Sequence, residues 1–138
     1  MRILLLTVIT AIAFPLMAGD TPAPAGASVY FIAPADGARL KSPVRVVFGL
    51  SGMGVAPAGT QKDKTGHHHL IIDADLPPAD KPIPADDNHR HFGGGQTETL
   101  IELEPGKHTL QLLLGDWKHV PHKSAVVSEK ITITVTRY

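Results

Sequence analysis

The alternation of side chains near the C-terminus constrains the fold of this chain most strongly. Three β-branched residues that recur at every second position are Ile131, Ile133 and Val135, with threonines between and after them. Side chains of a strand point alternately to its two faces, so this pattern predicts a strand over residues 126–136 with one face in a core. A helix would need apolar residues every three to four positions, and no segment beyond the N-terminal leader shows that period.

Five other segments have the composition of short strands and are separated by proline and glycine turns. They cover residues 29–32, 44–50, 67–73, 97–103 and 108–114. Several short strands joined in this way favour two packed sheets rather than helices. We therefore predict an all-β fold, an immunoglobulin-like antiparallel β-sandwich of about seven strands, in a single domain over residues 28–138.

Residues 74–95 interrupt the strand pattern with four prolines, three glycines and several aspartates. We expect a long, mostly irregular excursion with room for one edge strand. Ordered loops of this length often carry function, and disorder is the alternative interpretation.

The N-terminus has the pattern of a secretory signal peptide. Arg2 supplies the positive start, residues 3–17 form a short apolar run, and small residues precede a cleavage site near Gly19. The run is shorter than the about 20 apolar residues that cross a bilayer, so we expect no membrane span after cleavage. We predict a signal peptide over residues 1–18, a flexible Pro/Ala-rich lead-in over 19–27, and a periplasmic or secreted location.

Charge and cysteine content exclude several classes of protein. Lys plus Arg equal Asp plus Glu at 13 each, which argues against a nucleic-acid partner. The chain has no cysteine, which excludes disulfides, iron–sulfur clusters and a blue copper centre. Its eight histidines, by contrast, all lie between His67 and His122.

Most of these histidines are expected at one end of the predicted sandwich. In an immunoglobulin-like topology, that end holds the start of the strand at 67–73, the approach to the strand at 97–103 and the loop after 114. It would gather His67, His69, His89, His91, His119 and His122. Within each His-x-His pair the side chains share one face of a strand, roughly 6.5–7 Å apart. We expect His68 to face the core and His108 to lie at the opposite end.

The gathered histidines predict a metal site, because neutral imidazole is the commonest protein ligand for metals. The candidate ligands are His67, His69, His89, His91, His119, His122 and Met53, whose thioether would favour Cu(I). Asp116 and Asp87, beside Asp86, are candidates to orient the imidazoles or to ligate directly. Copper is the expected ion and zinc the alternative, since imidazole without thiolate suits both.

These features predict a periplasmic protein that carries, buffers or delivers metal, with the ion and a periplasmic protein as partners. Two alternatives remain open: a non-metal binding module that uses the same end loops, and a copper or zinc metalloenzyme. A pH-responsive polar cluster is another interpretation of the histidines. No general base stands out, which favours a binding protein over an enzyme.

Four long motifs resemble one known family. They are GMGVAPAG (52–59), GHHHLIID (66–73), HRHFGGGQTET (89–99) and PGKHTLQL (105–112), followed by Gly115-Asp116, His119 and Pro121-His122. On these motifs the chain resembles small secreted bacterial proteins of the domain-of-unknown-function 4399 family, from about residue 28 to residue 135. The resemblance implies a secreted bacterial protein and no particular activity, so the chemistry has to be argued from the residues.

Overall fold

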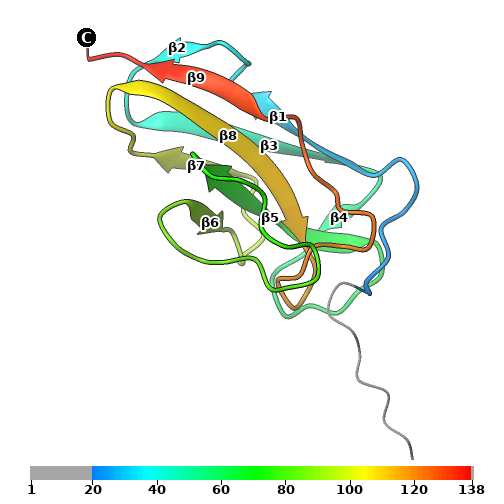
Figure 1. Cartoon of the computed structure of the whole chain (residues 1–138). Coiled ribbons are helices and arrows are strands. Elements are labelled where there is room, and N and C mark those ends of the chain that lie inside the picture. Colours follow the sequence, from blue (N-terminus) through cyan, green and yellow to red (C-terminus); the bar gives the residue numbers. More distant parts are fainter. Residues whose placement is uncertain (1–19, 138) are drawn as a thin grey trace, which may run out of the picture.

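A computed structural model describes residues 20–137, which form nine strands and no helix (Figure 1). The strands are β1 (Ser28–Ala33), β2 (Arg39–Leu40), β3 (Val44–Ser51), β4 (Gly54–Val55), β5 (Thr65–Ile72), β6 (His89–His91), β7 (Glu98–Ile101), β8 (Gly106–Gly115) and β9 (Ile131–Val135). The expected signal peptide, residues 1–18, lies outside the described residues. Within the described part, no helix is long and apolar enough to cross a membrane.

The strands form two packed sheets. The smaller sheet has the antiparallel order β1-β3-β7, and the larger has the order β2-β9-β8-β5-β4, with β6 also paired to β5. The pairs β2–β9 and β4–β5 are parallel, and the other pairs are antiparallel. In order along the chain, β1, β3 and β7 match strands A, B and E of an immunoglobulin domain, and β5, β8 and β9 match C, F and G. The predicted all-β sandwich is therefore confirmed.

The structure can be compared with the sequence prediction in two less regular regions, the C-terminal strand and residues 74–95. The C-terminal strand β9 is shorter than predicted, although Val127 still forms an isolated bridge with Leu113 of β8. The Ser128 N–H donates to the Leu112 carbonyl at 2.9 Å, so the chain follows β8 before β9 begins. Between residues 74 and 95, β6 is the one strand that the structure contains, as the predicted edge strand would be.

Strand β5 is buried on both of its faces, and this position creates the candidate site. Its even-numbered side chains, such as Leu70 and Ile72, lie in the core between the sheets. Its odd-numbered side chains point the other way, where Ile71 packs against Ile83 of the irregular excursion. Residues from Gly66 to Ile72 are consequently all buried. The excursion thus covers the outer face of β5 and of the adjacent part of β8, which would otherwise meet solvent.

The N-terminal lead-in is hydrogen-bonded to the segment that follows β8, at the end of the sandwich where β5 begins. The N–H of Lys123 donates to the Thr21 carbonyl at 2.8 Å, and Pro22 forms an isolated bridge with Lys123. The sequence predicted a flexible segment over residues 19–27, whereas residues 21–23 are hydrogen-bonded to the chain that follows β8.

Candidate metal centre

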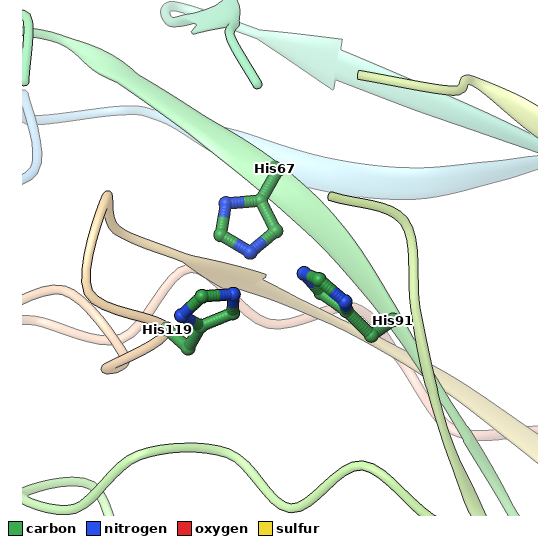
Figure 2. Close-up of side chains that lie close together, drawn as sticks. All are labelled: His67, His91 and His119. Atoms are coloured by element: carbon green, nitrogen blue, oxygen red, sulfur yellow. The ribbon is translucent and has the colours of Figure 1, made fainter. Parts of the chain in front are cut away.

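Four imidazoles from three separate parts of the chain pack together at the end of β8. His67 and His69 come from β5, His91 from β6, and His119 from the loop after β8. The six centroid distances among these rings range from 4.6 to 6.2 Å. Figure 2 shows the rings of His67, His91 and His119 turned toward one another, and they offer nitrogen atoms that lie within 4.8 Å of each other. We call these four residues the histidine cluster.

The strand register explains how the cluster forms. His69 is paired with His91 across the β5–β6 ladder, and His67 is paired with Gly115 across the β5–β8 ladder. Strand β8 ends at that pair, so the loop that follows it carries His119 directly over the outer face of β5. Residues that are far apart in the sequence therefore come together because β6 and β8 both pair with β5.

Two glycines leave room for the rings. A Cβ atom on Gly115 would lie 2.7 Å from His69 Nε2, and a Cβ on Gly93 would lie 2.3 Å from His91 Cε1. Neither distance is a tolerable contact between non-bonded atoms, so any larger residue at these positions would displace a ring. The sequence shows Gly93 only as one of three glycines in an irregular excursion and gives Gly115 no role, because only the folded chain shows which side chain each glycine faces.

A buried carboxylate holds the loop that carries His119. Asp116 is 3% exposed, and its Oδ1 accepts hydrogen bonds from the N–H groups of Lys118 at 2.8 Å and Val120 at 3.0 Å. The His119 N–H also donates to the Asp116 carbonyl at 2.9 Å. These bonds hold His119 in the left-handed region, at φ 67°, which non-glycine residues seldom adopt. Asp116 therefore shapes the loop. Among the described residues its carboxylate forms no hydrogen bond to an imidazole, although, against the larger effect of burial, its charge raises the pKa of His67.

Burial keeps the two imidazoles of β5 neutral. His67 is 0% exposed and His69 is 1% exposed. Burial, together with repulsion from His119 and His91, lowers the pKa of His67 to about 4. Burial, together with repulsion from His67, lowers the pKa of His69 to about 2. Burial also lowers the pKa of His91, with repulsion from His119 as the smaller cause.

The shortest contact in the cluster joins His69 Nε2 to His67 Nε2 at 3.0 Å. At that distance one nitrogen donates a proton and the other accepts it, so the two rings share one proton between these atoms. The Nδ1 atoms of both rings are buried and have no hydrogen-bond partner among the described residues. Buried polar atoms without partners are costly and rare, which marks the cluster as a functional candidate.

The nitrogen positions are close to those that a metal ion needs. With metal–nitrogen bonds of about 2.0–2.1 Å, two ligand atoms on opposite sides of an ion are about 4.2 Å apart. The nitrogen atoms of His67, His91 and His119 all lie within 4.8 Å of one another, so their separations exceed that span by at most about 0.6 Å. The Nε2 of His69 already lies beside that of His67 and could supply a fourth ligand.

The other predicted site residues lie apart from the histidine cluster. His89 Nδ1 donates to Asp86 Oδ1 at 2.8 Å, and His122 Nε2 donates to the Thr65 carbonyl at 3.1 Å. Met53 is half-buried and packs against the hydrophobic core. Asp87 is exposed, 3.8 Å from Arg90. Of the seven predicted ligands, the structure brings together the four of the histidine cluster.

The two histidines that the sequence placed outside the site do lie outside it. His68 faces the core, where its ring centroid is 5.0 Å from that of Phe48, and burial lowers its pKa to about 4. His108 lies at the other end of β8, where its Nδ1 donates to Asp73 Oδ2 at 2.6 Å and its Nε2 donates to the Glu104 carbonyl at 2.7 Å. The pattern of alternate faces in a strand accounts for the position of His68.

The chain matches the family described as "Domain of unknown function (DUF4399)" over residues 46–136, and it belongs to that family. The matched range contains the whole histidine cluster and Asp116, while Thr21 lies before it. Comparisons with curated proteins and with solved structures gave no match.

Proposed function

We propose that this DUF4399 protein binds one copper ion through the histidine cluster, in the periplasm or outside the cell, and carries, buffers or delivers it. The observation that carries the proposal is the packing of four imidazoles from three chain segments, with centroids 4.6–6.2 Å apart. A cluster of cationic imidazoles would repel itself, whereas neutral imidazoles can donate their nitrogen lone pairs to a bound cation.

The donor set favours Cu(II), with Zn(II) as the alternative. All four donors are imidazoles, and the thioether of Met53 packs on the core instead of joining them. A site without sulfur loses the main chemical preference for Cu(I), and among divalent ions an imidazole site binds copper most tightly. Geometry distinguishes the two ions, because Cu(II) prefers tetragonal and Zn(II) tetrahedral coordination.

Metal carriage fits the site better than catalysis does. The carboxylates of Asp116 and Asp86 accept hydrogen bonds from loop N–H groups and from His89. Among the described residues, no carboxylate is hydrogen-bonded to an imidazole of the histidine cluster, so no general base is paired with it. The exposure of the ligands is graded, since His67 and His69 are buried, His119 is half-buried and His91 is exposed. An ion could enter and leave on the side of His91 and His119 while the buried pair retains it.

The test is a titration of the mature, untagged protein with Cu(II) and Zn(II) in competition with a chelator of known affinity. We expect one copper ion per chain with nanomolar or tighter affinity, and loss of tight binding in the double variant His67→Ala/His69→Ala. Because these two side chains are buried, His91→Ala and His119→Ala provide a second pair of variants that changes more exposed positions. His89→Ala is the matched control, since His89 lies on β6 but bonds to Asp86.

Micromolar binding of several ions without preference would overturn the proposal, and so would unchanged affinity in the double variant. In that outcome, the same end of the sandwich would be better explained as a recognition surface for a protein or a glycan. Addition of chelator to the purified protein would then leave its thermal stability unchanged.

A further inference from the structure

We propose that Thr21, in the N-terminal lead-in, is a positioning residue for the ligand His119 and so tunes the affinity of the histidine cluster for metal. The inference rests on the proposed metal-binding function for its consequence. The structural link itself, from Thr21 through Asp116 to His119, stands on hydrogen bonds and can be tested without metal.

The first step of the link is a short hydrogen bond between distant parts of the chain. The Thr21 hydroxyl donates to Asp116 Oδ2 at 2.6 Å, across 95 positions of sequence. The other carboxylate oxygen of Asp116 accepts the two loop N–H groups described above. Both oxygens are thus engaged, and Thr21 fixes the orientation of the carboxylate that folds the loop.

The second step is the attachment of the lead-in itself. Lys123 donates its N–H to the Thr21 carbonyl at 2.8 Å, and the Ala23 N–H donates to the Lys123 carbonyl at 3.4 Å. These bonds hold Thr21 against the chain on the far side of the His119 loop. The loop is therefore fastened at Asp116 and again at Lys123, both times by the same short N-terminal segment.

The third step is the conformation of His119. Its backbone at φ 67° is unfavourable for a residue with a side chain, so the surrounding bonds must maintain it. If the carboxylate of Asp116 turned away, the loop could relax and the ring of His119 would leave its place, now 4.6 Å from the ring of His91. Outer residues that orient metal ligands typically change affinity by about 10–100-fold when they are replaced.

The first experiment is NMR on the full mature chain without metal, with Thr21→Val, which keeps the shape but removes the hydroxyl, and Thr21→Ser, which keeps the hydroxyl. We expect contacts between the rings of His119 and His91 in the native protein and in Thr21→Ser. In Thr21→Val these contacts should weaken, and the amide of Val120 should exchange faster. Unchanged contacts and exchange in Thr21→Val would overturn the positioning role, whatever the protein binds.

The second experiment measures Cu(II) affinity for the same variants, alone and combined with His119→Ala. We expect Thr21→Val to lower the affinity by about tenfold, Thr21→Ser to keep the native affinity, and Thr21→Val to have no further effect when His119 is already alanine. A general loss of stability would instead weaken binding equally in both backgrounds, which would refute positioning through His119.

The two proposals fail in different ways. If the native protein binds no metal but Thr21→Val alters the His119 contacts, the function is wrong and the positioning role stands. If copper binds tightly and Thr21→Val matches the native protein in both experiments, the function stands and the positioning role is wrong.

Discussion

The replacement of Gly93 by alanine should displace His91, one of the proposed metal ligands, without replacing a histidine. A Cβ atom at this position would lie 2.3 Å from His91 Cε1, 2.5 Å from His91 Nε2 and 3.3 Å from the Cβ of Ala58. Ala58 closes the other side, so the ring of His91 is the group that must yield. Because His91 is exposed, its side chain can rotate outward, and we expect the free energy of unfolding to change by less than about 1 kcal/mol.

The displacement is large on the scale of a coordination bond. To reach an ordinary contact of about 3.4 Å, the ring atom would retreat by about 1.1 Å, whereas metal–ligand distances tolerate about 0.2 Å. The nitrogen of His91 would therefore leave the site. We expect Cu(II) affinity to fall by about tenfold or more, equivalent to about 1.4 kcal/mol, as in His91→Ala.

The assay is competitive copper titration of Gly93→Ala, His91→Ala and their combination, beside thermal unfolding of each. Gly94→Ala is the matched control, because the three atoms nearest to its Cβ all belong to the exposed side chain of Gln96, at 3.0 Å or more. Native affinity in Gly93→Ala together with weak binding in His91→Ala would refute the steric reasoning. Equal losses in Gly94→Ala and Gly93→Ala would show instead that the loop as a whole is sensitive.

Three further predictions follow from packing and charge in the metal-free protein. Gly115→Ala should destabilise the fold by about 1–3 kcal/mol in denaturant unfolding, because its Cβ would press on the ring of His69, which is 1% exposed. Burial alone would lower the pKa of His108, but its hydrogen bonds to Asp73 and to the Glu104 carbonyl raise it in the folded protein. The resulting stabilisation is present below pH 6.5 and is lost as the pH rises through the folded pKa. In urea unfolding, His108→Gln should therefore cost more stability at pH 6 than at pH 9, by less than about 1 kcal/mol. His68 has a folded pKa of about 4 because it is buried, so native stability should fall as the pH drops from 6.5 toward 4, by at most about 1.4 kcal/mol per pH unit for this residue, and His68→Leu should have a shallower acid profile in the same assay.

Strand alternation and turn chemistry were sufficient to predict the class of the fold. The pattern at Ile131, Ile133 and Val135 corresponds to β9, and all three side chains are buried as that pattern requires. The predicted strand was too long at its N-terminal end, because residues 126–128 follow β8 only through an isolated bridge and single hydrogen bonds. Composition alone does not distinguish a continuous ladder from a neighbouring extended segment.

The histidine cluster could be predicted in part. The assumption of an immunoglobulin-like topology was enough to expect the β5 pair, His91 and His119 at one end of the sandwich. It also placed His122 and His89 there. His122 bonds to the carbonyl of Thr65 at the start of β5, and His89, two positions before His91 in β6, bonds to Asp86, so neither joins the cluster. The His-x-His spacing states only that two side chains share a face. Which of the two imidazoles joins the histidine cluster depends on the residue that each histidine faces on the paired strand.

The residues that support the cluster left no trace in the sequence pattern. Gly93 and Gly115 resemble turn glycines, and Thr21 lies in a segment whose composition is typical of a linker. Each acquires its role from a contact between segments far apart in sequence: a ring over a glycine, or a hydroxyl on a carboxylate. Such contacts depend on the three-dimensional pairing of the strands, which single-sequence reasoning reaches only through an assumed topology.

The most informative departure from ordinary folding rules is in β5 itself. A strand that is buried on both faces is expected to be apolar throughout, yet its first half carries three consecutive histidines that are each 0–1% exposed. Burial lowers the pKa values of all three, and their Nδ1 atoms lack partners among the described residues, so the sequence accepts a cost in stability at this place. For His67 and His69, a cation bound at the Nε2 atoms would offset part of the cost of burying the two rings, whereas His68 faces the core and would gain nothing directly. Replacement of His67 and His69 should therefore raise the free energy of unfolding of the metal-free protein by less than it reduces the magnitude of the free energy of metal binding. That balance is expected of a site maintained for a ligand rather than for the fold.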